Sequence, residues 1–388
     1  MEHRHKLVLI IGLSSLSLLT ILLLTLLRCR RRKAGNGSRD IEAAFECKER
    51  DGLVKTEDLI KFEGGEDLSV QEILDAPGEV IGKSSYGTLY KACLVSSNSL
   101  TLLRFLRPTC TLRMKEVMPI VELLGSVRHP NLVPLNAFYA GPRGEKLMVH
   151  PFYWPGNLGQ FIRDGNGEAH KWPVICRISI GVARGLHHLH TAYEKPIIHG
   201  NLKSKNILLD SNYHPHVSDF GLHLLLNPPA GQQMLEVSAS QGYKAPELIK
   251  MKDACEESDI YSLGVILLEL LTGKKPVDEN PTPNQDFYLP SAMRSAILDD
   301  RIADLYHPNI LLGLSSDQKV ATEDGILRYF QLAMACCSRP VSSGLMQRKS
   351  STSLKKSESR DKHDVGNIVN FIIVLTSSTN MATTNRGF

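Results

Sequence analysis

The stretch that decides the fold reads His-Gly-Asn-Leu-Lys-Ser-Lys-Asn at residues 199–206, and Asp-Phe-Gly follows at residues 219–221. Two further features come later in the chain, Ala-Pro-Glu at residues 245–247 and a lone acid at Asp259. Taken alone, the first run is typical of a loop built from polar turn residues. The order and spacing of all four features argue against that interpretation and indicate one organised site.

In spacing and in most identities, these motifs resemble the catalytic loop and the metal-binding turn of eukaryotic protein kinases, whose loop reads His-Arg-Asp-Leu-Lys-x-x-Asn. Two positions differ. Asn201 stands where the family carries the Asp that accepts the proton of the substrate hydroxyl, and Gly200 stands where it carries Arg. An amide keeps a carbonyl acceptor but has no negative charge and essentially no basicity. The resemblance therefore implies an α+β, bilobal protein-kinase fold with impaired chemistry.

Composition restricts the classes of function. The chain has 388 residues, of which a bilobal kinase-type domain would take most, so we expect one main folded unit. The net charge of +4 is carried by a basic cluster at residues 28–33. Because the rest of the chain is close to neutral, we expect no nucleic-acid partner. The eight cysteines lack a metal-type spacing and are predicted to be reduced thiols.

Residues 7–27 carry no charge and are rich in Leu and Ile. Their length suffices to cross about 30 Å of hydrocarbon, which predicts a single transmembrane helix. The alternative, a cleaved signal peptide, normally has an apolar region of about 7 to 15 residues and does not end in a basic cluster. The basic flank places the following residues in the cytosol. We therefore expect a single-pass protein of the plasma membrane, in contact with the bilayer through residues 1–33 and without an ectodomain.

Residues 34–68 are polar and show no sustained period, which predicts a juxtamembrane linker before a small lobe at residues 69–150. Residues 80–92 resemble the strand, glycine-rich turn and strand that cover ATP phosphates in kinases. Gly82 and Gly87 stand where the first and third glycines belong. Ser84 takes the second position, where a β-carbon narrows the approach of a phosphate.

The next predicted strand, residues 100–106, departs from the family pattern as well. Leu102 would intrude on the adenine space, and Arg104 replaces the lysine that grips phosphate as a compact charge. Ile120 falls where a glutamate would pair with that lysine. Glu116, one turn earlier, is one possible partner for Arg104. The other is Asp219, which Arg104 would reach by turning into the metal position.

Residues 150–153 would form the hinge, where the carbonyl of Pro151 and the amide of Tyr153 remain for an adenine edge. The large lobe is predicted at residues 151–337. Within it, residues 174–190 have the period of a helix packed on a core, and residues 258–273 resemble a central buried helix. Ser238 and Ser240 are conceivable phosphosites, with ordinary loop serines as the alternative.

Two features of the large lobe are less specific. His187 and His190 lie one turn apart and could share a metal ion, but without nearby acids or thiols a structural role is favoured. The resemblance stops after residue 337, and residues 338–388 are expected to form an atypical, largely disordered tail.

The full set of motifs resembles the kinase domains of plant leucine-rich-repeat receptor-like kinases, especially inactive, transmembrane-kinase-like members. That resemblance implies that Lys203 faces the transferred phosphate, that Asn206 and Asp219 hold magnesium, and that Gly82 and Gly87 shape the cover over ATP.

Three hypotheses follow for the function. The first is a membrane-anchored pseudokinase that acts as a scaffold or regulator of active receptor kinases and other signalling proteins, with weak or absent binding of ATP and Mg. The second is a weakly active, ATP-dependent serine/threonine kinase. The third is a cleft closed to nucleotide by an ion pair between Arg104 and Asp219.

Overall fold

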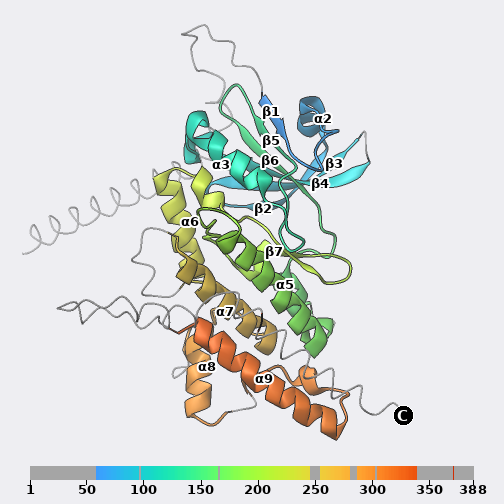
Figure 1. Cartoon of the computed structure of the whole chain (residues 1–388), viewed down its shortest axis with the longest axis vertical. Helices are drawn as coiled ribbons and strands as arrows, with labels where there is room; N and C mark the ends of the chain where they lie inside the picture. Colours follow the sequence, from blue (N-terminus) through green and yellow to red (C-terminus); the bar gives the residue numbers. More distant parts are fainter. Residues whose placement is uncertain are drawn as a thin grey trace, which may run out of the picture. The chain divides into compact units, whose positions relative to one another are not determined.

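The computed structural model describes residues 58–95, 98–164, 167–244, 254–279, 286–301, 304–338 and 370 (Figure 1). The predicted membrane segment at residues 7–27, its basic flank, the Ala-Pro-Glu motif and nearly all of the predicted tail lie outside the described residues. Among the residues that are described, no helix combines the length and the apolar character needed to cross a membrane.

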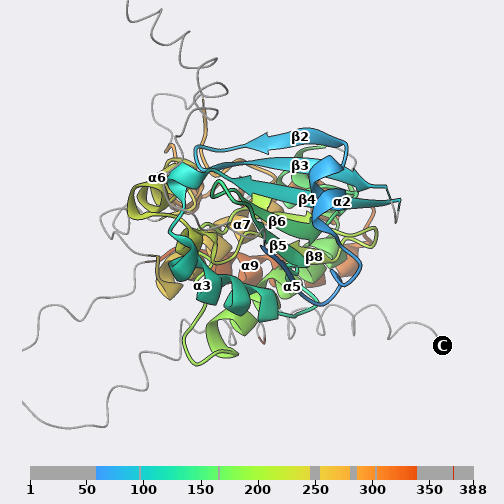
Figure 2. The same cartoon turned by 90° about the horizontal axis from the view of Figure 1, so that it is seen from above.

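A six-stranded antiparallel sheet forms the small lobe, in the order β1-β5-β6-β4-β3-β2. The strands are β1 (Asp58–Lys61), β2 (Gly78–Lys83), β3 (Gly87–Leu94), β4 (Ser99–Leu106), β5 (Ala137–Ala140) and β6 (Lys146–Pro151). The short helix α2 (Val70–Asp75) packs Ile73 into one apolar cluster with Leu94 and Leu103 of the sheet. The longer helix α3 (Met114–Ser126) lies beside the sheet (Figure 2). It buries Val117, Val121 and Leu124 in the main core.

The sheet begins earlier than the sequence indicated. Strand β1 lies within residues 34–68, which were expected to be linker, and it pairs with β5 along its whole length. A four-residue strand is too short to show a period in the sequence, and its apolar members, Leu59 and Ile60, pack against the core only partly. The small lobe therefore includes residues upstream of position 69.

Helices dominate the large lobe. They are α4 (Leu158–Arg163), α5 (Trp172–Thr191), α6 (Pro228–Ser240), α7 (Glu256–Thr272), α8 (Leu289–Leu298) and α9 (Ser316–Cys336). A hairpin of β7 (Ile207–Leu209) and β8 (Pro215–Val217) lies beside α5. The helices predicted at residues 174–190 and 258–273 are confirmed as α5 and α7. Helix α7 is buried from Ser258 to its end, between α5 and α9, so it positions the loops around it (Figure 1).

Helix α6 was not predicted, although the chain carries a signal for it. Asn227 caps its first turn by accepting from the N–H of Ala230, and two prolines follow at the start of the helix. The backbone N–H of Asn227 donates to the carbonyl of Cys110, which ties this segment to the loop before α3. Ser238, a predicted phosphosite, is only 3% exposed, whereas Ser240 is exposed. Ser238 is therefore accessible only if α6 unfolds.

Candidate functional site

A cavity of about 630 Å³ opens between the sheet and the large lobe. Its lining brings together most of the residues predicted for the site, namely Gly82, Ser84, Gly87, Leu102, Arg104, Tyr153, Lys203, Asn206 and Asp219. Two predicted residues are not in the lining. Pro151 ends β6, and Asn201 is buried in the catalytic loop. Most of the predicted residues therefore lie together at one cavity, and the geometry within it decides what it can bind.

Arg104 and Asp219 form an ion pair in this cavity. The Nη2 atom of Arg104 lies 2.7 Å from each carboxylate oxygen of Asp219, and the two side chains are only 10% and 9% exposed. The predicted turn of Arg104 toward Asp219 is thus confirmed. Glu116 instead accepts from the backbone N–H of Arg113 at 3.1 Å, and Ile120 packs against the main core.

This ion pair determines whether the site fits a magnesium ion. Both oxygens of Asp219 already accept from a guanidinium, and a cation at that distance repels a second cation. The Nδ2 atom of Asn206 donates to the carbonyl of Asn201 at 3.0 Å. Elsewhere in the described chain, no group of three His, Cys, Asp or Glu residues could hold a metal ion. In this arrangement the two predicted metal residues do not fit Mg²⁺, which prefers free carboxylate oxygens.

The glycine-rich turn is closed by its own hydrogen bonds. The N–H of Ser84 donates to the carbonyl of Gly87 at 2.9 Å, and the N–H of Gly87 donates to the Oγ atom of Ser84 at 3.1 Å. The serine that replaces a glycine therefore occupies a backbone donor that a phosphate would need. A β-carbon at Gly87 would lie 2.3 Å from the carbonyl oxygen of Phe105, so strand packing alone requires glycine there.

The aromatic residue of this turn, Tyr86, packs inward. It joins the main apolar core, and burial together with the negative charge of Asp219 raises the pKa of its hydroxyl. On β6, burial lowers the pKa of His150 to about 4. Its Nδ1 atom lies 2.9 Å from the carbonyl oxygen of Pro134, as expected for a neutral ring that donates there. Tyr86 and His150 are therefore both neutral beside the ion pair of Arg104 and Asp219.

Aromatic rings gather where the adenine edge was expected. The ring of Tyr153 packs on His216 with centroids 4.4 Å apart, and burial raises the pKa of Tyr153 to about 12. The Nζ atom of Lys91 lies 4.7 Å from the ring centre of Trp154 and 5.3 Å from that of Phe152. These cation–π contacts were not predicted, because they join a strand to a loop sixty residues away.

Asn201 is buried in the catalytic loop, at 3% exposure, but its side-chain oxygen lacks a hydrogen-bond partner among the described residues. The Nζ atom of Lys203 donates to the side-chain oxygen of Gln241 at 3.3 Å. Burial lowers the pKa of Lys203, and the positive charge of Lys205 acts in the same direction. An amide therefore stands where a kinase needs a base, and the lysine two residues later is half-buried.

His223, which the sequence analysis did not identify, packs beside Gly200. Gly200 has φ of +77°, and a β-carbon there would lie 2.7 Å from the Nδ1 atom of His223. His223 is half-buried, and burial lowers its pKa. The imidazole therefore fills the space beside the position where the family carries an arginine.

Beneath the loop, Asp259 is 1% exposed and accepts three hydrogen bonds. The N–H groups of His199 and Gly200 donate to it at 2.7 Å and 2.9 Å, and His190 Nε2 lies 3.0 Å from it. His190 therefore has the structural role that was favoured over metal binding. One carboxylate from α7 thus holds the backbone at the start of the catalytic loop.

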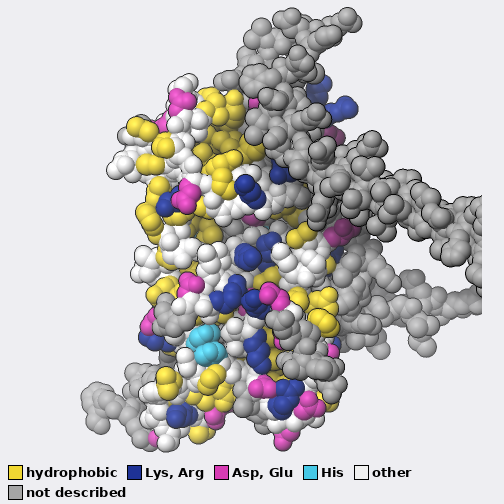
Figure 3. Space-filling view, turned by 180° about the vertical axis from the view of Figure 1, so that it is seen from behind, with side chains coloured by type: hydrophobic (Ala, Val, Ile, Leu, Met, Phe, Trp, Pro, Cys, Tyr) yellow, Lys and Arg dark blue, Asp and Glu magenta, His cyan; other side chains and the backbone are white. Residues whose placement is uncertain are grey.

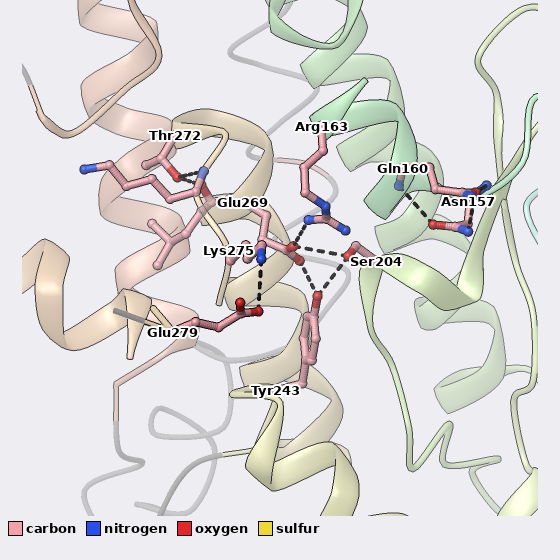
Figure 4. A network of polar contacts seen from close by, with 11 residues as sticks. Asn157, Gln160, Arg163, Ser204, Tyr243, Glu269, Thr272, Lys275 and Glu279 are labelled. Atoms are coloured by element: carbon pink, nitrogen blue, oxygen red, sulfur yellow. Dashed lines mark hydrogen bonds and ion pairs between the residues drawn. The ribbon is translucent and has the colours of Figure 1, made fainter. Parts of the chain in front are cut away.

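A second carboxylate of α7, Glu269, joins three segments of the large lobe (Figure 4). Its oxygens accept from the Tyr243 hydroxyl at 2.6 Å and from Ser204 Oγ at 3.1 Å, and the guanidinium of Arg163 lies 3.6 Å away. Burial raises the pKa of Glu269 to about 7 in spite of these partners. An acid inside an apolar helix was visible in the sequence, but its partners come from distant segments.

The sequence is similar to those of known protein kinases. The model of the protein kinase domain family matches residues 76–308. The kinase-like protein TMKL1 of Arabidopsis thaliana is 37% identical over 336 residues, which cover 85% of this chain and 49% of the relative. A second Arabidopsis thaliana protein, named as a probable inactive receptor kinase, is 33% identical over 286 residues, 72% of this chain and 43% of the relative. The chain thus spans about half or less of the length of these relatives.

Solved structures show the same architecture. The kinase domain of maize SIRK1 bound to AMP-PNP aligns with a TM-score of 0.67 and 28% identity, covering 82% of this chain and 100% of that one. The pseudokinase domain of BIR2, described as an immune regulator, aligns with a TM-score of 0.59 and 27% identity over 80% of this chain and 82% of that one.

Proposed function

This chain belongs to the protein kinase domain family, and on that premise we propose that it is a pseudokinase that holds or regulates active receptor kinases. The observation that carries the proposal is the ion pair between Arg104 and Asp219, because it takes the carboxylate that would hold magnesium. Asn201 removes the general base as well, and loss of a base typically costs about a hundredfold to ten-thousandfold in rate. The fold is thus kept, whereas the general base and the strand lysine are replaced by Asn201 and Arg104.

The relatives support a regulatory role. One is named as a probable inactive receptor kinase, and the pseudokinase domain of BIR2 belongs to a protein described as an immune regulator. A kinase fold that binds a partner needs an ordered surface and no turnover. The proposed partners are therefore receptor kinases and other signalling proteins.

We further propose that residues 1–33 anchor the protein in the plasma membrane, with the kinase-like lobes in the cytosol. The support is the uncharged run at residues 7–27 and the basic cluster that follows it. Residues 338–388 then form a cytosolic tail. A membrane tether raises the local concentration of the domain beside receptor kinases in the same bilayer.

A phosphotransfer assay tests the proposal directly. The full chain, purified free of other kinases, is incubated with Mg-ATP and a general protein substrate, and an Asp219→Ala variant serves as the control. We expect the two proteins to give the same background signal. Phosphorylation of the chain or the substrate that disappears in Asp219→Ala would overturn the proposal.

The second candidate function, a weak serine/threonine kinase, is favoured by one observation. Lys203 and Asn206 still line the cavity, and the related maize kinase domain binds AMP-PNP. Because the transition state of phosphoryl transfer is loose, a hydroxyl positioned by Asn201 would retain some reactivity. The double variant Asn201→Asp with Arg104→Lys tests this function. If those two positions alone limit a kinase, the double variant gains phosphotransfer. We expect it to remain inactive, because Ser84 still closes the glycine-rich turn and Ile120 still stands in place of the glutamate.

A further inference from the structure

The segment that leads into the small-lobe sheet is attached to α3 through one aromatic ring. Ile60 and Phe62, which lie two residues apart, both pack against the main core, whereas Leu59 packs with the second apolar cluster. A β-carbon at Gly125, in the last turn of α3, would lie 2.1 Å from two atoms of the Phe62 ring. The ring of Phe62 therefore rests directly on the backbone of α3.

The guanidinium of Arg128, two residues after α3, reinforces this attachment. Its Nη1 atom donates to the carbonyls of Gly125 and Val127, at 2.8 Å each. Its Nη2 atom donates to the carbonyl of Glu63 at 3.1 Å, and its Nε atom lies 3.4 Å from the Glu63 carboxylate. Because that carboxylate is exposed, the carbonyl contacts contribute most of the attachment. One side chain thus joins the residue after Phe62 to the end of α3.

The residue of α3 before Gly125 contacts the cleft. Leu124 is 2% exposed, and its Cδ2 atom would lie 2.7 Å from a β-carbon at Gly221. Together with Arg104 and Asp219, Leu124 also lines a void of only about 10 Å³. With so little free volume, the end of α3 cannot shift without displacing either the turn at Gly221 or the ion pair.

The turn at residues 219–221 has a backbone that needs support from its surroundings. Asp219 has φ of +65° and Gly221 has φ of +67°. A non-glycine residue in this left-handed region is held there by the contacts around it. The ion pair with Arg104 and the packing of Leu124 on Gly221 are two such contacts. The position of α3 and the pairing of Asp219 therefore belong to one arrangement.

We propose that residues 60–63, which we call the latch, keep the metal position closed by holding α3 against the turn of Asp219. Displacing the latch releases Asp219 from Arg104, so Phe62 is a positioning residue that acts through α3. The inference rests on the proposed function and deepens it by naming what controls the closed cleft. Because the latch follows residues 34–57 in the sequence, a partner that binds this preceding part of the chain would act on the cleft through α3.

Hydrogen–deuterium exchange of the full chain, in nanodiscs of neutral phosphatidylcholine, tests this proposal. Hydrophobic side chains also gather elsewhere on the small lobe (Figure 3), so a matched control is needed. Leu59→Ala is that control, because it removes an apolar side chain of the same segment that packs away from α3. We expect the amides of residues 219–224 to exchange at least about fivefold faster in Phe62→Ala than in Leu59→Ala. Equal rates in the two variants would overturn the proposal.

A second variant tests the contact from the side of α3. Gly125→Ala places a methyl group where the Phe62 ring lies, so it should accelerate exchange of residues 219–224 as Phe62→Ala does. In the double variant the methyl group has room, and we expect no further acceleration beyond that of Phe62→Ala. Additive effects of the two changes would show that they act separately and would contradict the latch.

Binding of Mg-ATP, measured by calorimetry, distinguishes a latch from a general loosening of the fold. Phe62→Ala should acquire saturable, Mg²⁺-dependent binding, because its Asp219 is released, whereas Leu59→Ala should not. A loosened fold would gain no ligand, so absence of binding by Phe62→Ala would overturn the proposal. If Arg104→Ala nevertheless binds Mg-ATP, the closed cleft of the proposed function stands, and the two failures are distinguishable.

Discussion

The two sides of the catalytic loop differ in what their polar groups contact. Below the loop, Asp259 and Glu269 of α7 accept hydrogen bonds from the loop backbone, from Ser204 and from Tyr243. Above it, Arg104 and Asp219 satisfy each other, and so do Ser84 and Gly87. The contacts on the lower side thus hold the loop in place. On the upper side, groups at the positions that bind ligands in the family contact each other instead.

This difference separates the requirements of a fold from those of a reaction. A buried carboxylate under the loop is needed whether or not phosphate is transferred, because the backbone N–H groups of the loop need acceptors. A free carboxylate above the loop is needed only if a metal ion is to be held. A chain without phosphotransfer activity can lose the free carboxylate above the loop while it keeps the buried carboxylate below it.

The largest effect is expected from breaking the lower side. Asp259→Ala leaves three buried donors without an acceptor and should lower the free energy of unfolding by about 3 to 5 kcal/mol. Urea denaturation followed by circular dichroism measures it. Asp324→Ala, which removes an exposed partner of Arg328, should cost less than about 0.5 kcal/mol. Similar values for the two variants would contradict the structural role of Asp259.

The pH dependence of stability tests the second carboxylate of α7. The pKa of Glu269 is raised from its ordinary value of 4.5 to about 7, so the folded state binds a proton that the unfolded state has released. Stability from this group is therefore fully present below pH 4.5 and is lost as the pH rises to about 7. Between these limits the native chain should lose about 3 kcal/mol more than Glu269→Gln. Parallel stability profiles for the two proteins would contradict this.

Gly200→Ala tests the fit between the loop and His223. The left-handed backbone disfavours a β-carbon, and the contact with His223 adds to that cost, so we expect a loss of about 1 to 3 kcal/mol. Gly313→Ala is the matched control, because Gly313 has φ of +78° and nothing within 4 Å of a new β-carbon. The double variant Gly200→Ala with His223→Ala should recover the difference between the two. No recovery would show that His223 does not set the cost.

The smallest effect is expected at the adenine end of the cleft. Lys91→Ala removes a cation from the rings of Trp154 and Phe152 and should cost about 0.5 to 1 kcal/mol. Because Trp154 is 72% exposed, its fluorescence should report the change. Lys83→Ala, which removes another lysine of the same cavity, should leave the emission unaltered. Equal changes in both variants would indicate a general charge effect.

Much of the fold could be predicted from the sequence, because its signals are local. The glycine turn, the catalytic loop and the buried helix α7 each lie within about twenty residues and carry their own pattern. Strand β1 was not predicted, because four residues are too few to show a period. Helix α6 was not predicted either, although Asn227 and the two prolines after it are a signal for the start of a helix. Local pattern thus determines most elements, and errors concentrate at the short ones.

The sequence indicated which residues lie at the cavity more fully than it indicated the contacts between them. The sequence left two possible partners for Arg104, Glu116 and Asp219, and the structure selects Asp219. By contrast, the fit of His223 beside Gly200 joins residues whose proximity only the fold creates. The charged residues of a motif can be identified from the sequence, whereas the residues that they contact in the fold cannot.

Calorimetric titration of the full chain with Mg-ATP tests the central claim, that Arg104 closes the metal position by pairing with Asp219. The account predicts no saturable, Mg²⁺-dependent heat for the native chain up to millimolar nucleotide, and Mg²⁺-dependent binding in Arg104→Ala, where the carboxylate is released. Micromolar, Mg²⁺-dependent binding by the native chain that is lost in Asp219→Ala would contradict it.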